Sequence, residues 1–125
     1  MAIQRNIEID GREVPFKASA ALTRMYRARF GRDIIKDFDR ILAEMDGEDP
    51  DLSTLSVESL ERFEDIAYTM AKYADPAVPE TVEAWLDGFN TFSIYFVLPQ
   101  LADMWGLNVQ TEAEAKKNLS QVTAR

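Results

Sequence analysis

The sequence has 125 residues, of which 46% are hydrophobic and 29% charged, a composition typical of one globular domain with a buried core. It contains no cysteine and no histidine, which excludes disulfides, thiolate nucleophiles, the usual zinc ligands and the commonest general base. We therefore expect an assembly or binding protein that is not an enzyme and uses no cofactor or metal. Chemistry through Asp, Glu or Ser alone stays open, although no motif points to it.

The formal net charge of -8 is unevenly spread along the chain. Residues 1–40 carry nine Lys or Arg and six Asp or Glu, whereas residues 41–125 carry five and 16. This polarity suits either a head-to-tail contact between copies or two solvated faces that never meet. Residues 1–10 are too polar for a signal peptide, and the longest apolar run, 92–98, is too short for a bilayer. We expect a cytoplasmic protein without a membrane partner.

The first residues show the alternation of a strand pair. Their inward apolar positions are Ile7, Ile9, Val14 and Phe16. Asp10-Gly11 lies between the two runs and favours a tight turn, because both positions tolerate positive φ. We predict a hairpin over residues 3–17, with an open edge at Pro15, which has no amide hydrogen to donate.

Two helices are predicted next. Ser19 is the expected N-cap of the first helix, and Gly31 its left-handed end. Its apolar positions are Leu22, Met25, Tyr26 and Phe30. Asp33 caps the second helix, which ends in the polar loop 46–51. Its apolar stripe is Ile34, Ile35, Phe38, Ile41, Leu42 and Met45.

A long third helix and a short fourth are predicted after that loop. Ser56 caps the third helix and Asp75-Pro76 ends it. Its buried stripe is Leu60, Phe63, Ile66, Ala67, Met70 and Ala74, and its wet face is Glu61, Arg62, Glu64 and Asp65. The fourth begins near Pro79 and ends at Gly88. Its apolar face is Val82, Trp85, Leu86 and Phe89.

The segment 91–105 is apolar nearly all round. Pro99 lacks an amide hydrogen and its ring would press on the carbonyl of Tyr95, which predicts a kink or two abutting helices before Gly106. One interpretation is a central core helix, and the other is an open surface that receives an apolar helix or another copy. Both hold if one side faces inward and the other outward.

These patterns predict a mostly helical α+β fold. It has an N-terminal β-hairpin and four to five α-helices within 19–106, all in a single globular domain over 1–108. Residues 109–125 are polar, and we expect them to form a flexible tail.

Two clusters of carboxylates are better explained by solvation than by chemistry. The loop 46–51 is acidic, but Val57 and Leu60 stand where a calcium loop needs a bidentate glutamate. The third helix carries Glu61, Glu64 and Asp65, which could bind magnesium or act as acid and base. They lie opposite the predicted buried stripe, so we expect each to be solvated and ionised. The five glycines are isolated and form no phosphate-binding loop.

Basic residues gather around the break at Gly31. They are Arg24, Arg27, Arg29, Arg32, Lys36 and Arg40. A helix-turn-helix DNA-binding regulator is one interpretation. The second helix also carries three aspartates that phosphates would repel, so we expect no nucleic-acid partner.

Two long stretches and one short stretch contain the most specific sequence patterns of the chain. They are IEIDGREVPFKASAALTRMYRARFGRDIIKDF at 7–38, EDIAYTMAKYADPAVPETVEAWLDGFNTFSIYFVLPQLADMWGLN at 64–108, and Lys116-Lys117-Asn118. In order and spacing these stretches resemble the tail assembly chaperone family of long-tailed, siphovirus-type phages and prophages of Gram-positive bacteria. The first two cover well over half of the chain.

The resemblance implies a role in virion morphogenesis. A chaperone of this family binds the tape-measure protein stoichiometrically and keeps it soluble in the host bacterial cytoplasm while the tail tube assembles. It is absent from the mature virion. Further copies of itself, the major tail tube protein and a longer, frameshifted form are the other partners implied. Lys116-Lys117-Asn118 can be encoded as A-AAA-AAC, a typical slip site. The family has no catalytic residues.

Partner contacts are expected on the aromatic segment, at Phe92, Tyr95, Phe96, Met104 and Trp105. Charge contacts between copies are expected at Arg24, Arg27 and Arg32. The main alternative is a permanent phage structural protein of the head–tail connector type, which would remain in purified virions. A small DNA-binding regulator is the lesser alternative.

Overall fold

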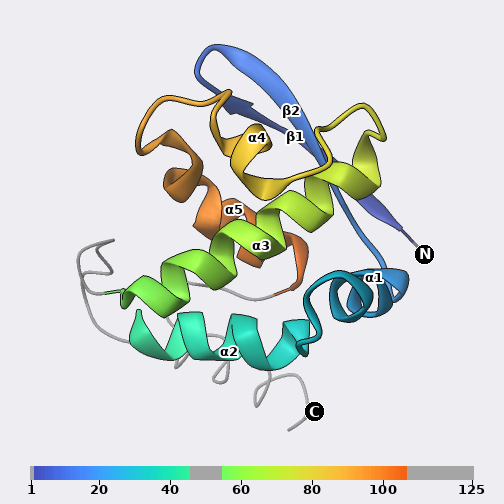
Figure 1. Ribbon diagram of the computed structural model, residues 1–125, viewed down its shortest axis with the longest axis vertical. Helices are drawn as coiled ribbons and strands as arrows, with labels where there is room; N and C mark the ends of the chain where they lie inside the picture. Colours follow the sequence, from blue (N-terminus) through green and yellow to red (C-terminus); the bar gives the residue numbers. More distant parts are fainter. Residues whose placement is uncertain (1, 46–54, 107–125) are drawn as a thin grey trace, which may run out of the picture.

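The computed structural model describes residues 2–45 and 55–106, which form an N-terminal hairpin followed by helices (Figure 1). In chain order the elements are β1 (Ile3–Ile9), β2 (Arg12–Ala18), α1 (Ala21–Phe30), α2 (Ile34–Glu44), α3 (Val57–Ala74), α4 (Val82–Leu86), the 3₁₀ helix η2 (Ser93–Val97) and α5 (Leu98–Met104). The predicted mostly helical α+β class is confirmed. The expected loop at 46–51, the tail at 109–125 and Lys116-Lys117-Asn118 lie outside the described residues.

Helix α3 runs through the middle of the molecule. The hairpin, α1, α2, α4 and η2 all pack against it, and Figure 1 shows α2 alongside its first half. From Asp65 to Ala71 every residue of α3 is buried. The helix is therefore covered on more than one side, unlike the surface helix that its apolar stripe predicted.

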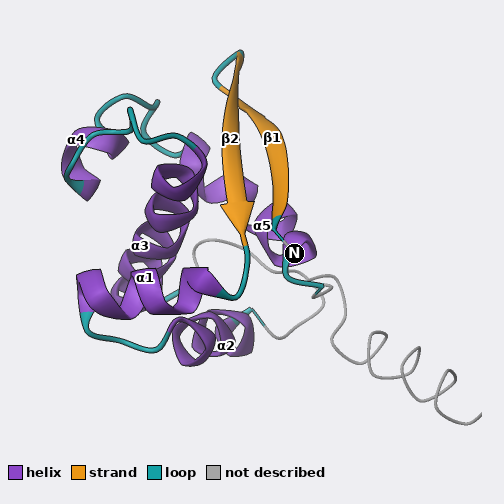
Figure 2. Cartoon of the chain, turned by 90° about the vertical axis from the view of Figure 1, so that its right-hand side faces the viewer, coloured by secondary structure: helices purple, strands orange, loops and turns teal. Residues whose placement is uncertain are grey.

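The hairpin has the predicted turn and register. Asp10 and Gly11 both adopt positive φ, of 54° and 77°, which matches the right-handed twist of the strands. Ile7 pairs with Val14, and Pro15 stands opposite Asn6. The four alternating apolar side chains are buried. Strand β2 packs against α3 and β1 against η2 and α5, and Figure 2 shows the hairpin upright beside α3. Because the sheet of the described residues has two strands, Pro15 lies on an edge as expected.

Most helix ends follow the predicted caps. Asp33 accepts hydrogen bonds from the amides of Ile35 and Lys36, and Ser56 accepts one from that of Ser59. Gly31 ends α1 in the left-handed conformation, with φ of 69°. These contacts confirm three of the expected helix boundaries.

Two predicted helix starts are displaced, by one residue at α1 and by two to three residues at α4. Ala20, not Ser19, occupies the N-cap position of α1, although the Ser19 hydroxyl accepts a hydrogen bond from the amide of Ala21 at 3.2 Å and lies 2.8 Å from the hydroxyl of Tyr73. Helix α4 begins after Thr81, whose side chain accepts from the amide of Ala84, and not at Pro79. At α4 the side chain of Thr81 caps the helix and so moves its start beyond Pro79.

The core closes around an aromatic cluster between the hairpin, α3 and α4. The Trp85 ring meets Phe16, Tyr68 and Phe89 edge-on, at centroid distances of 6.5, 5.8 and 5.1 Å.

The predicted apolar stripe of α2 is narrower than expected, because Ile35 is 60% exposed while its neighbour Ile34 is buried. Successive helical residues point about 100° apart, which carries Ile35 out of the contact.

Segment 91–105 forms two abutting helices, as Pro99 predicted. The 3₁₀ helix η2 leads directly into α5, and Pro99 is the second residue of α5. At that position an amide has no intrahelical acceptor, so the missing hydrogen costs nothing. Gly106 follows with φ of 76°, which confirms the predicted stop.

Candidate partner-binding surface

Two phenylalanines of the aromatic segment face outward from a buried scaffold. Phe92 is 64% exposed and Phe96 is 68% exposed. The residues beside them, Ile94 and Val97, are buried in the core. The segment therefore places some of its apolar residues in the core and leaves two phenylalanines exposed, which combines both interpretations of its sequence. We refer to Phe92 and Phe96 as the Phe pair.

The hairpin turn fixes the start of this segment. The carboxylate of Asp10 accepts hydrogen bonds from the amide and the side chain of Asn90, at 2.8 and 3.0 Å. It also accepts one from the hydroxyl of Ser93, at 3.0 Å. Three donors around Phe92 are thus bound by one side chain from the opposite end of the chain. This role of Asp10 was not predicted, because the Asp-Gly pair is fully explained by its turn.

Tyr95 ties the other end of η2 to α3. Its hydroxyl donates to the carboxylate of Glu64 at 2.5 Å, and its ring lies 6.2 Å from that of Phe63. Burial raises the pKa of Tyr95 to about 12, and the hydrogen bond to Glu64 acts in the same direction. Tyr95 is half-buried and attaches η2 to α3.

The other two predicted contact residues pack inward. Met104 is 4% exposed and belongs to the core. The half-buried Trp105 lies against Phe38 of α2, with ring centroids 5.0 Å apart. Of the five aromatic-segment residues expected to meet a partner, Phe92 and Phe96 are the ones that the structure leaves broadly exposed.

The expected wet face of α3 is the main correction to the sequence analysis. Asp65 is 7% exposed, and burial raises its pKa despite the neighbouring Arg32. Burial also raises the pKa of Glu64, with a further contribution from the negative charges of Asp65 and Glu61. The predicted solvation is therefore wrong for these two residues, since Asp65 is buried and Glu64 is half-buried. The single apolar stripe concealed the second buried side of the helix.

Arg32 is engaged inside the chain rather than on its surface. It donates to Asp37 at 2.8 Å, to Asp65 at 2.6 Å and to the hydroxyl of Tyr26 at 2.8 Å. Arg62 adds a second cation beside Asp37, at 3.2 Å. Burial opposes the ionisation of Asp37, but the hydrogen bonds from Arg32 and Tyr26 prevail and hold its pKa below the usual value. This network joins α1, α2 and α3, so Arg32 has no free charge for another copy.

Arg24 and Arg27 do lie on the surface. Both are exposed on α1, and neither takes part in an ion pair or side-chain hydrogen bond within the described part of the chain. They remain available for a contact with an acidic neighbour.

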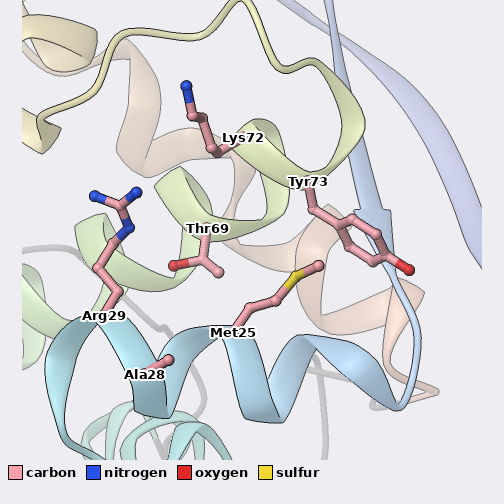
Figure 3. Close-up of a pocket in the computed structure, with 6 residues that line it drawn as sticks. All are labelled: Met25, Ala28, Arg29, Thr69, Lys72 and Tyr73. Atoms are coloured by element: carbon pink, nitrogen blue, oxygen red, sulfur yellow. The ribbon is translucent and has the colours of Figure 1, made fainter.

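A groove of about 590 Å³ separates α1 from α3 (Figure 3). It is lined by Met25, Ala28 and Arg29 of α1 and by Thr69, Lys72 and Tyr73 of α3. The Arg29 side chain donates to the carbonyl of Glu80, and Lys72 pairs with the Glu80 carboxylate at 2.9 Å. Because both cations are used within the chain, the groove offers no free charge for a ligand. Phe92 and Phe96 are not among the residues that line this groove.

Among residues 2–45 and 55–106, no helix has the length and hydropathy needed to cross a bilayer. Those ranges also hold no group of three or more side chains suited to share a metal ion.

Comparison of the chain with protein-family models, with curated proteins and with solved structures finds no match.

Proposed function

We propose that this protein is a phage tail assembly chaperone that binds the tape-measure protein stoichiometrically and keeps it soluble, with the Phe pair as its apolar contact. The observation that carries the proposal is the exposure of Phe92 and Phe96 on a segment whose other side is anchored in the core. Exposed aromatic side chains on a fixed scaffold are typical of protein-binding surfaces.

The size and charge of the molecule support reversible coating of a long partner. Two phenylalanines make a modest contact, so strong overall binding would need many copies along one partner. Modest individual contacts allow the tube protein to displace the coat. The net charge of -8 would keep such a many-copy complex soluble.

Co-expression with the longest helical protein encoded beside this gene tests the proposal. The soluble fraction of that protein should rise in the presence of the parent chain. The double variant Phe92→Ser/Phe96→Ser should lose this effect while keeping its thermal unfolding midpoint. Ile35→Ser is the matched control, because Ile35 is an equally exposed apolar residue on α2, at 60%. Equal activity of the Phe92→Ser/Phe96→Ser variant and the parent would contradict the proposal.

Mass spectrometry of purified virions separates the chaperone from a permanent head–tail connector. The chaperone is expected to be absent from the host-released particle, whereas a connector would be retained. The DNA-binding alternative is weakened by the engagement of Arg32 with Asp37 and Asp65, which removes one of the cations it would need.

A further inference from the structure

The outer edge of β1 carries backbone groups without a partner in the described part of the chain. In a two-residue hairpin the residues that flank the turn, Ile9 and Arg12, form a hydrogen-bonded pair, and such pairs alternate with unbonded pairs along the ladder. The backbone amides and carbonyls of Gln4, Asn6 and Glu8 therefore point away from β2. Within residues 2–45 and 55–106, no backbone group of another element bonds to them, and all three residues are exposed.

The outer edge of β2 is interrupted. The residues that point outward there are Glu13, Pro15 and Lys17, and Pro15 has no amide hydrogen to donate. The Lys17 ammonium lies over the ring of Tyr73, 4.6 Å from its centroid. Because an uninterrupted row of unpaired backbone groups is a template for another strand, β1 is the edge at which this sheet can be extended.

We propose that β1 pairs antiparallel with β1 of a second copy, about a two-fold axis at Asn6, to form one continuous sheet. This register pairs all seven residues of the strand, since it sets Asn6 opposite Asn6 and Ile3 opposite Ile9 of the second copy. An axis at Arg5 would set two arginines opposite each other. An axis at Ile7 would carry Ile3 past the end of the partner strand.

The inner face of β1 fits this register. Ile3 is 49% exposed at the open end of the strand, and Ile9 of the second copy gives it an apolar neighbour. A charge that points inward can protect an edge from pairing, and Arg5 lies on this face. Arg5 is already paired with Asp103 of α5 at 2.8 Å, so it brings no free charge into the extended sheet.

The outer face fits as well. Glu8 stands opposite Glu13 in the hairpin, a like-charge pair that destabilises two neighbouring strands. Neither glutamate forms an ion pair within the described residues. In the proposed register Gln4 of the second copy lies on the other side of Glu8 and supplies an amide donor to its carboxylate. The two Asn6 side chains at the axis can each donate to the other.

Sedimentation velocity over a range of protein concentrations tests the inference. The parent chain should form dimers as the concentration rises. Asn6→Pro should stay monomeric, because it removes the outward amide at the axis. Pro15 occupies the facing position of β2, so a proline is compatible with the hairpin at this register. A circular dichroism spectrum like that of the parent checks that the variant folds.

Charge substitutions at the axis test the register without changing the backbone. Asn6→Asp and Asn6→Lys each set like charges opposite each other in a dimer, and each should raise the dissociation constant at least about threefold. A mixture of the two variants should form heterodimers in excess of random pairing, as measured by native mass spectrometry. Ala43→Asp and Ala43→Lys, at an exposed position on α2, are the matched controls and should dimerise like the parent.

A disulfide reports the contact directly, because the chain has no cysteine of its own. Opposite residues of a hydrogen-bonded antiparallel pair have Cα atoms about 5.5 Å apart, a distance that a disulfide spans. Mild oxidation should link Asn6→Cys into a covalent dimer. Glu13→Cys, an exposed position on the outer edge of β2, should be linked far more slowly.

A parent chain that stays monomeric would overturn the inference, even if its β1 edge takes up an extended peptide of another protein. Dimers that persist in Asn6→Pro would also overturn it, as would equal rates of disulfide formation in Asn6→Cys and Glu13→Cys. Dimers lost in Phe92→Ser/Phe96→Ser but kept in Asn6→Pro would assign self-association to the Phe pair instead. The inference goes beyond the proposed function, and none of these measurements involves the tape-measure protein, so the two succeed or fail separately.

Discussion

The Nη2 atom of Arg32 lies 2.6 Å from the carboxylate of Asp65, a residue 33 positions further along the chain. This pair joins the turn after α1 to the buried middle of α3. Since Asp65 is 7% exposed, its charge depends on Arg32 for compensation.

Replacing Arg32 with methionine should destabilise the fold strongly. The substitution leaves Asp65 buried without a cation and removes one of two cations from Asp37. We expect a loss of about 3 kcal/mol in the free energy of unfolding, measured by urea titration. Arg24→Met, on the exposed face of α1, should change it by less than about 0.5 kcal/mol. Similar small losses in both variants would mean that the network contributes little.

Replacing Glu64 with glutamine should make stability less dependent on pH. Burial raises the pKa of Glu64 above its ordinary value of 4.5, so the folded chain binds this proton more readily than the unfolded chain. The contribution of Glu64 is therefore most favourable below 4.5 and is lost as pH rises through the folded pKa. The glutamine variant should be more stable than the parent at pH about 7, and the difference should vanish towards pH about 4.

Urea titrations across that range measure this difference, and Glu83→Gln controls for the loss of one negative charge. A glutamine variant that is less stable than the parent at neutral pH would show that the charged bond from Tyr95 outweighs burial.

Replacing Asp10 with glycine should release the segment around Phe92 with little loss of global stability. Glycine accepts the φ of 54° without strain but provides no acceptor for Asn90 and Ser93. The Asn90 amide should exchange with solvent at least about tenfold faster, corresponding to a loss of about 1.4 kcal/mol in local protection. Hydrogen exchange measured by NMR checks this, with the amide of Ile66 in α3 as an internal reference. Unchanged protection at Asn90 would contradict the anchoring role of Asp10.

Replacing Trp85 with alanine should cost about 3–5 kcal/mol of stability. The side chain is 5% exposed and contacts aromatic rings from β2 and α3. Trp105→Ala is the comparison, because Trp105 is half-buried at the end of α5 and should cost less. Chemical denaturation followed by circular dichroism measures both. A greater loss for Trp105 would place the centre of stability at α5 instead.

Local signals were sufficient wherever a neighbour in sequence determines the structure. Asp10-Gly11 predicted the hairpin turn, and Asp33 and Ser56 predicted two helix starts, since each acts on amides within three residues. Pro99 likewise predicted the break between η2 and α5. The fold class followed from these elements in order.

The candidate surface was only partly predictable, because exposure depends on residues far away in sequence. The aromatic pattern identified the segment. Phe96 and Met104 are both large apolar residues of that segment, so the sequence does not distinguish them, yet Phe96 is 68% exposed and Met104 is 4% exposed. Asp65 looked solvated because one apolar stripe cannot reveal that α1 and α2 cover the opposite side of α3. The bonds from Asp10 to Asn90 and Ser93, and from Glu64 to Tyr95, emerge only when tertiary contacts are known.

The bonds from Asp10 to Asn90 and Ser93 connect positions 80 and 83 residues apart. During synthesis the hairpin leaves the ribosome before α3, yet a two-stranded sheet alone is at best marginally stable in water. Its apolar side chains need α3, and its turn needs residues that are translated much later. The hairpin therefore reaches its final conformation only after residues 90–93 have been translated. The bonds between Asp10 and the segment around Phe92 form at that same late step. A truncated nascent chain would expose the apolar side chains of the hairpin, which are buried in the folded chain.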